Sequence, residues 1–144
     1  MPGFTLRRTV WSEDAPRLQE VRFEVFVREQ GVPLELEWDE FDALSRHVLA
    51  TSHDGRAVGT GRLLPDGHIG RMAVLAAWRR CGVGRAILTE LLAMAREEGH
   101  ASVVLHAQTH ATGFYARHGF EPEGDAFLEA GIPHRTMRRR LLTK

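Results

Sequence analysis

The chain has 144 residues with 19 basic and 19 acidic side chains, so its formal net charge is zero. This length fits one domain, which we expect to span residues 1–144. A neutral balance provides no general field to attract nucleic acid or an anionic membrane. One cysteine excludes an internal disulfide, and we recognise neither a signal peptide nor a stretch of about 20 apolar residues. We therefore expect a cytoplasmic protein of bacterial type.

The first part of the chain predicts a strand followed by a long helix. Residues 4–10 alternate weakly between polar and apolar side chains, which indicates a strand. Ser12 can cap a helix that continues to about Glu29, where a glycine and a proline follow and end it. The acidic residues within 35–42 are interpreted as a solvated loop, and the alternative is a surface that attracts a cationic amine.

The rest of the chain predicts alternating strands and helices. The elements are, in order, strands over 47–53 and 57–64, a strand ending near Leu75, a helix over 84–98, a strand over 102–108, a helix over 109–118, and a hairpin of 127–128 with 135–141. The unit over 69–108 predicts a right-handed parallel crossover, and the strands before it an antiparallel meander. The fold class is therefore α/β, with a mixed central sheet flanked by helices.

The basic, glycine-containing turn over 79–85 is the most informative local pattern. It lies between an apolar strand and a helix that begins near Gly84. Free N–H groups in a first helical turn and the helix dipole both attract anions. Gly82 and Gly84 allow a close approach of the backbone, and Arg79, Arg80 and Arg85 add full positive charges. The turn predicts a phosphate site suited to a diphosphate.

Two common nucleotide motifs do not fit this turn. A Walker loop needs a lysine directly after its second glycine, and a dinucleotide fingerprint needs a small residue where Ile87 stands. A helix start surrounded by solvated arginines remains the plain alternative.

Two segments resemble the GNAT superfamily of N-acetyltransferases. Residues 79–84 match its pyrophosphate motif, Arg/Gln-x-x-Gly-x-Gly/Ala. A second segment matches the GNAT pattern Asn-x-x-Ala-x-x-Phe-Tyr-x-x-x-Gly-Phe at Ala111, Phe114, Tyr115, Gly119 and Phe120. Gln108 replaces the usual asparagine. Further segments between Val21 and Met137 are similar to the ElaA-like or YjcF-like subgroup.

The resemblance implies a GNAT fold and acetyl-CoA as the cosubstrate, with no metal. Its parallel strands would splay apart to admit the pantetheine arm, and backbone N–H groups near Ala73 and Val74 would polarise the thioester carbonyl. The residues that it assigns to cofactor binding are Met72, Ala73, Val74, Arg79, Arg80, Cys81, Gly82, Val83, Gly84, Arg85, Gln108 and Phe114.

Acetyl transfer to an amine needs a proton donor for the departing thiolate. Tyr115 can supply that proton, because its reference pKa of ~10 lies slightly above that of a thiol. The expected reaction is direct transfer to a primary amine of a small molecule or peptide. Cys81 is a poor nucleophile candidate, since no base motif is near it in sequence.

The sequence provides several candidates for the base. Arg22 and Glu29 interrupt the apolar stripe of the first helix, and a charge there is either paired or functional. Glu29 could deprotonate the amine, or it could form an ion pair with Arg22 or Arg28. His134 and His106 are further base candidates. We place Arg22, His106 and His134 on the acceptor side of the site.

Several other functions are kept as alternatives. The chain also resembles acyl-homoserine-lactone synthases over residues 26–42, and a non-catalytic CoA-binding module is the other alternative.

His106 and His110 have a metal-ligand spacing, but a predicted change from strand to helix separates them. The basic residues 138–140 read as a solvated strand end, so no nucleic-acid or membrane partner is expected. A homodimer remains open.

Overall fold

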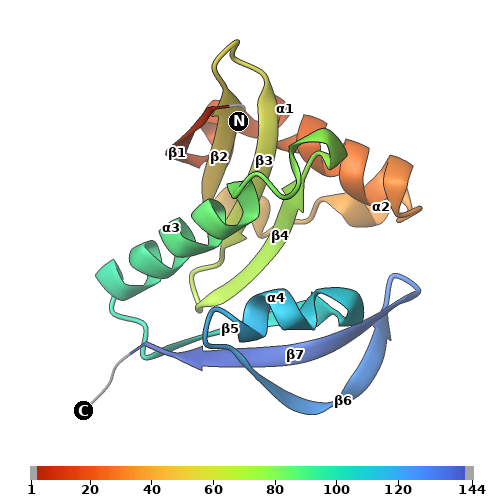
Figure 1. Cartoon of the computed structure of the whole chain (residues 1–144), viewed down its shortest axis with the longest axis vertical. Coiled ribbons are helices and arrows are strands. Elements are labelled where there is room, and N and C mark those ends of the chain that lie inside the picture. The colour runs from red at the N-terminus through yellow and green to blue at the C-terminus, as the bar shows by residue number, and fades with distance from the viewer. Residues whose placement is uncertain (1–2, 142–144) are drawn as a thin grey trace.

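Figure 1 shows the computed structural model, which describes residues 3–141. The ends of the predicted domain, residues 1–2 and 142–144, lie outside the described residues. The strands are β1 (Phe4–Val10), β2 (Arg46–Ser52), β3 (Ala57–Leu63), β4 (His68–Val74), β5 (Ser102–Gln108), β6 (Glu121–Glu129) and β7 (Ile132–Arg140). The helices and helical turns are α1 (Trp11–Arg22), η1 (Phe23–Glu29), α2 (Leu34–Glu37), η2 (Asp42–Leu44), η3 (Ala76–Trp78), α3 (Val83–Glu97), η4 (Thr109–Ala111) and α4 (Thr112–Ala116).

The strands form one mixed sheet in the order β1-β2-β3-β4-β5-β7-β6. Neighbours pair antiparallel except β4 and β5, which are parallel and are connected through α3. The register of that parallel pair contains only His68 opposite Val104 and Ile69 opposite Leu105. The predicted fold class, an antiparallel meander plus a splayed parallel pair flanked by helices, is confirmed.

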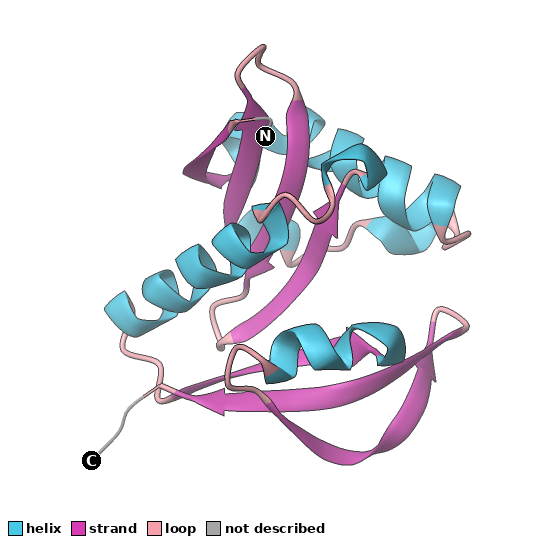
Figure 2. Ribbon diagram, in the orientation of Figure 1, coloured by secondary structure: helices cyan, strands magenta, loops and turns pink. Residues whose placement is uncertain are grey.

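Helices cover both faces of the sheet around β3. In Figure 2, α3 crosses one face and α1 lies on the other. Every residue of β3 is buried. A Cβ atom on Gly59 would lie 2.8 Å from Val83 Cγ1, and one on Gly61 would lie 2.7 Å from Ile87 Cγ2. These two glycines therefore let α3 approach the sheet closely.

The first helix differs from its prediction at both ends. It begins at Trp11 with Val10 as its N-cap, and no side chain caps it, so the predicted Ser12 cap is wrong. From Phe23 to Glu29 the helix is a π-helix, in which Gln30 N–H donates to the Val25 carbonyl. Such i→i−5 turns are wider than α-helical turns, so each residue advances less around the axis.

The acidic segment is not a solvated loop, and that prediction is wrong. It contains the short helix α2 and the turn η2, and the carboxylates of Glu37 and Asp42 are buried. Their charges are balanced by buried arginines, as described below.

The C-terminal part of the sheet is more exposed than the first part. The predicted helix over 109–118 is a short 3₁₀ turn followed by the five-residue α4. The hairpin of β6 and β7 is longer than predicted, and nearly all of β6 is exposed. Among the described helices, none is long and apolar enough to cross a membrane.

Candidate active site

A cavity of about 690 Å³ lies where β4 and β5 diverge. It brings together residues from both sequence motifs. Its lining includes Met72, Ala73, Val74, Arg79, Gly84, Gln108, Phe114 and Tyr115, together with the acceptor-side candidates Glu29, His106 and His134. The other predicted turn residues, Arg80, Cys81, Gly82, Val83 and Arg85, are not among its lining residues.

The turn before α3 has the geometry of an anion-binding loop. Arg80 and Gly82 have φ angles of 64° and 86°, and Gly82 is the N-cap of α3. No side chain caps this helix. Its first N–H groups can therefore donate to a bound anion. Arg79, Arg80 and Arg85 are exposed around the turn, so the residues present fit a diphosphate.

The edge of β4 that faces β5 is largely unpaired. Within residues 3–141, the β4–β5 register ends at Ile69, so residues 70–74 have no strand partner on that side. Arg71 has a φ angle of 49°, and the β3–β4 register shifts beside it. A free strand edge can accept an extended chain of amides as an added strand.

Tyr115 reaches from α4 to β4 across this cavity. Its hydroxyl donates to Met72 Sδ at 3.6 Å. The rings of Phe114 and Phe120 hold it, with centroids 5.1 and 5.9 Å away. Burial raises the pKa of Tyr115 to about 12. The hydroxyl therefore stays protonated at neutral pH, and its thioether partner is only a weak acceptor.

Glu29 forms an ion pair with the first arginine of the turn. Arg79 donates from Nη1 and Nη2 to the two carboxylate oxygens of Glu29, each at 2.6 Å. The alternative of an ion pair with Arg22 or Arg28 is therefore wrong as to the partner; Arg28 lies 3.4 Å from Glu24 instead. The hydrogen bonds from Arg79 lower the pKa of Glu29, which makes that carboxylate a weaker proton acceptor.

Arg22 is in the core and does not line the cavity, which corrects its predicted place on the acceptor side. Its side chain is 0% exposed and donates to Glu37 Oε1 at 2.6 Å and to Asp42 Oδ1 at 2.8 Å. Arg62 donates to the same Asp42 oxygen at 3.0 Å. The wider turns of η1 separate the faces of Arg22 and Glu29, which α-helical spacing would have joined.

Two histidines line the cavity from β5 and β7. His106 Nδ1 is 2.9 Å from Glu129 Oε1, and His134 Nδ1 is 2.6 Å from the Ile132 carbonyl oxygen. His134 Nε2 lies 4.0 Å from the other Glu129 oxygen. Glu129 therefore connects the two predicted histidines. It belongs to no motif, and only the pairing of β6 with β7 shows where it lies.

Gln108 bridges β5 to η1. Its amide pairs reciprocally with that of Gln30, at 2.9 and 3.3 Å. This contact lies across the cavity from the β4 edge. Sequence analysis identified Gln108 through the motif but missed Gln30, because that residue carries no pattern of its own.

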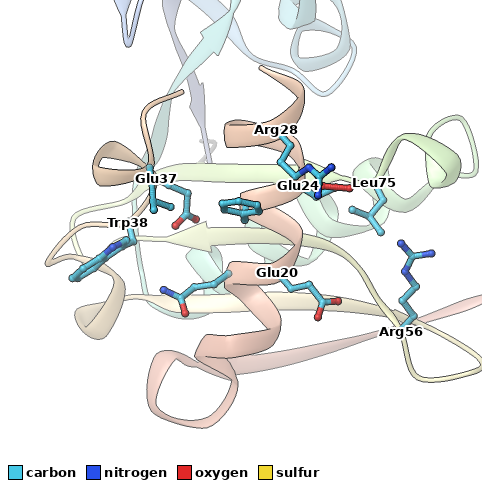
Figure 3. Close-up of a pocket in the computed structure, with 10 residues that line it drawn as sticks. Glu20, Glu24, Arg28, Glu37, Trp38, Arg56 and Leu75 are labelled. Carbon is cyan, nitrogen blue, oxygen red and sulfur yellow. The ribbon is translucent and has the colours of Figure 1, made fainter. Parts of the chain in front are cut away.

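A second cavity, of about 620 Å³, lies on the outer side of α1 and η1. Figure 3 shows its lining residues, including Glu20, Glu24, Arg28, Trp38 and Arg56. None of the predicted cofactor residues lines it. The cavity between β4 and β5 is therefore the candidate active site. Across residues 3–141, no group of three or more His, Cys, Asp or Glu side chains could hold a metal ion.

Comparison with known proteins agrees with this geometry. Residues 14–141 match the family model of the acetyltransferase (GNAT) domain. The uncharacterized N-acetyltransferase YjcF of Bacillus subtilis is 42% identical over 124 residues, which cover 83% of this chain and 87% of YjcF. Escherichia coli ElaA has a TM-score of 0.85 at 30% identity, covering 94% of this chain and 99% of that one.

A further solved structure has the same fold. The acyl-CoA N-acyltransferase of Pseudomonas aeruginosa has a TM-score of 0.84 at 31% identity, covering 95% of this chain and 99% of that one. With the family model matching most of the chain, the protein belongs to the GNAT family of acetyltransferases, is of the ElaA/YjcF type, and is an acyltransferase.

Proposed function

We propose that the protein transfers the acetyl group of acetyl-CoA directly to a primary amine of a small molecule or peptide. The observation that carries this proposal is the position of Tyr115. Its protonated hydroxyl reaches Met72 on β4, and the cationic turn before α3 adjoins the same cavity. A phosphate site, a free strand edge and a proton donor together suit a CoA thioester.

The cosubstrate would bind in three parts. Its diphosphate would accept hydrogen bonds from the backbone N–H groups in the first turn of α3 and would contact the arginines of residues 79–85. Its pantetheine amides pair with the free edge of β4. The thioester carbonyl then lies near the backbone N–H groups of Ala73 and Val74, which would stabilise the developing oxyanion.

The reaction balances without a covalent enzyme intermediate. The neutral amine nitrogen attacks the thioester carbon, and a C–N bond forms. The C–S bond breaks, the amine nitrogen loses one proton to a base, and Tyr115 donates its hydrogen to the thiolate. Because burial raises the pKa of Tyr115 to about 12, the hydroxyl is protonated throughout the neutral range, and the same shift makes it a weaker acid than an exposed tyrosine.

The test is a screen for released thiol with acetyl-CoA and a panel of small amines, polyamines and peptides. We expect CoA release that depends on one class of amine. Reaction only with thioesters of an acyl carrier protein would support a homoserine-lactone-synthase-like activity. Acetyl-CoA binding without release for any acceptor would support a non-catalytic module.

The diphosphate position has its own test in Gly84. A Cβ there would lie 3.7 Å from Phe114 Cζ, an ordinary contact, so alanine fits. Gly84→Asp adds a negative charge at the helix start and should weaken acetyl-CoA binding at least ~10-fold in calorimetry. Gly84→Ala is the matched control and should bind nearly as the wild type does. Equal affinity of folded Gly84→Asp and Gly84→Ala would remove the diphosphate from this turn.

A further inference from the structure

We infer that His106 is the base that accepts the proton of the acceptor amine, and that Glu129 is the residue that positions it. This inference rests on the proposed function, and it names the residue that the direct transfer still lacks. The pair is assembled from two strands that are not neighbours. His106 is on β5, Glu129 ends β6, and β7 lies between them in the sheet.

The hydrogen bond between the two side chains fixes the state of the imidazole. An ionised carboxylate can only accept, so His106 Nδ1 must carry the hydrogen in the 2.9 Å contact with Glu129 Oε1. In the neutral ring, Nε2 then keeps its lone pair. The negative charge of Glu129 also stabilises the imidazolium that forms once Nε2 has taken a proton. This arrangement suits a general base.

The ring is further held by its neighbours. The Phe127 ring lies at 5.1 Å in an edge-to-face arrangement, and the His68 ring at 6.3 Å is also nearly perpendicular. These contacts restrict the imidazole orientation while 41% of the side chain remains exposed. The base is therefore both oriented and accessible.

His134 is a weaker candidate for the same role. Its Nδ1 donates to a backbone carbonyl rather than to a carboxylate, at 2.6 Å. A neutral carbonyl stabilises an imidazolium less than a carboxylate does. The His134 side chain is also only 9% exposed, so an amine or a bridging water has less access to it.

Glu29 is also a weaker candidate than His106. Both of its oxygens accept hydrogen bonds from Arg79, which lowers the pKa of that carboxylate. Among residues 3–141, the side-chain hydrogen-bond partner of His106 is the Glu129 carboxylate and not a cation. His106 and Tyr115 line one cavity, so His106 can take the proton from the amine while Tyr115 protonates the departing thiolate.

The charged and titratable groups around His106 come from three strands and the cavity wall. They are His68 and Arg71 from β4, Glu129 from β6 and His134 from β7. His68 in turn lies 3.0 Å from Asp66. Any of these groups can shift the pH at which activity changes. The test therefore compares His106 and Glu129 variants with a variant of a remote histidine. All variants are measured with the same amine, so the ionisation of the amine affects every profile equally.

The experiment measures kcat/KM for the amine against pH in His106→Gln, Glu129→Gln and Glu129→Asp, and acetyl-CoA affinity by calorimetry. His106→Gln should lower kcat/KM roughly 100-fold and flatten the acidic limb. Glu129→Gln should lower kcat/KM by a smaller factor, because the carboxylate that accepts from His106 Nδ1 and orients the ring is gone. Glu129→Asp should recover part of the loss. Acetyl-CoA affinity should stay unchanged in all three.

His53→Gln is the matched control, since His53 is exposed in the turn between β2 and β3; it should behave as the wild type. If His106→Gln transfers acetyl at the wild-type kcat/KM and keeps the acidic limb of its pH profile, this inference is overturned and the proposed function still stands. Unchanged profiles in Glu129→Gln would overturn the positioning role. A wild type that transfers no acetyl group to any amine would overturn both proposals.

Discussion

Two groups of an arginine with carboxylates in this molecule have similar hydrogen-bond geometry and different burial. Arg22 meets Glu37 and Asp42 under α1, where the three side chains are 0%, 3% and 1% exposed. Arg79 meets Glu29 beside the active-site cavity, where the side chains are 40% and 42% exposed. The hydrogen-bond distances between arginine and carboxylate in both places lie between 2.6 and 3.0 Å. Burial is the variable that separates them.

That difference predicts different roles. A buried charge that loses its partner cannot recover hydration, so each member of the Arg22 group is needed for folding. A half-exposed pair is screened by water and adds little to stability, so its members can exchange partners. The Arg79 guanidinium can therefore exchange Glu29 for another anion at little cost to stability, whereas Arg22 is committed to the fold.

The largest expected effect comes from Asp42→Asn. The substitution keeps the shape of the side chain but removes the charge that Arg22 and Arg62 share. We expect a loss of about 3–5 kcal/mol in the free energy of unfolding, measured by urea denaturation. A loss below about 1 kcal/mol would show that the buried group resembles the exposed pair, and the comparison would fail.

Within this group, Asp42 predicts an acid sensitivity of the fold. Burial alone would raise the pKa of Asp42, but hydrogen bonds and charge from Arg22 outweigh it and hold that pKa at about 2, below the ordinary 3.8. A carboxyl with a lowered folded-state pKa stabilises the fold above its unfolded pKa. That contribution should disappear between about pH 4 and pH 2 in the wild type. The Asp42→Asn variant should lack this component of the decline.

The next effect is on chemistry and not on folding. Tyr115→Phe keeps the ring contacts with Phe114 and Phe120 but removes the hydroxyl that reaches Met72. We expect kcat to fall roughly 100-fold with little change in acetyl-CoA affinity or unfolding free energy. Single-turnover kinetics and calorimetry would measure these quantities. Unchanged kcat with a rate-limiting chemical step would assign thiolate protonation to water or to another group.

Local patterns in the sequence predicted most of the strands and the cationic turn. The glycines and arginines of residues 79–85 act through their own backbone and charge, so their spacing was sufficient. The parallel pair also followed from the order of strand, helix and strand. These features depend on few contacts that are distant in sequence.

Features set by tertiary contacts were not predictable in the same way. The π-helical turns of η1 moved Glu29 away from the face of Arg22, and no residue pattern announces such a helix. Asp42 looked like part of a charged loop because its partner Arg22 is 20 residues away. Glu129 meets His106 only after β6 has folded back on β7.

The smallest expected effect on stability is that of Glu29→Gln. It makes the same change as Asp42→Asn, a carboxylate to its amide opposite an arginine, but at a half-exposed site. The free energy of unfolding should change by less than about 1 kcal/mol. Urea denaturation of both variants under one buffer gives the direct comparison.

The Glu29→Gln variant should also bind acetyl-CoA more tightly. This result would most clearly distinguish the half-exposed Arg79–Glu29 pair from the buried Arg22 group. In the structure Glu29 occupies the Arg79 guanidinium, so an incoming diphosphate must compete with it. Removing the carboxylate should raise affinity by roughly threefold, equivalent to the ~0.6 kcal/mol of an exposed pair. Weaker binding would mean that Glu29 holds Arg79 in its binding position. If Glu29→Gln instead lowers kcat/KM for the amine about 100-fold and also removes the acidic limb of the pH profile, the base is Glu29 and not His106.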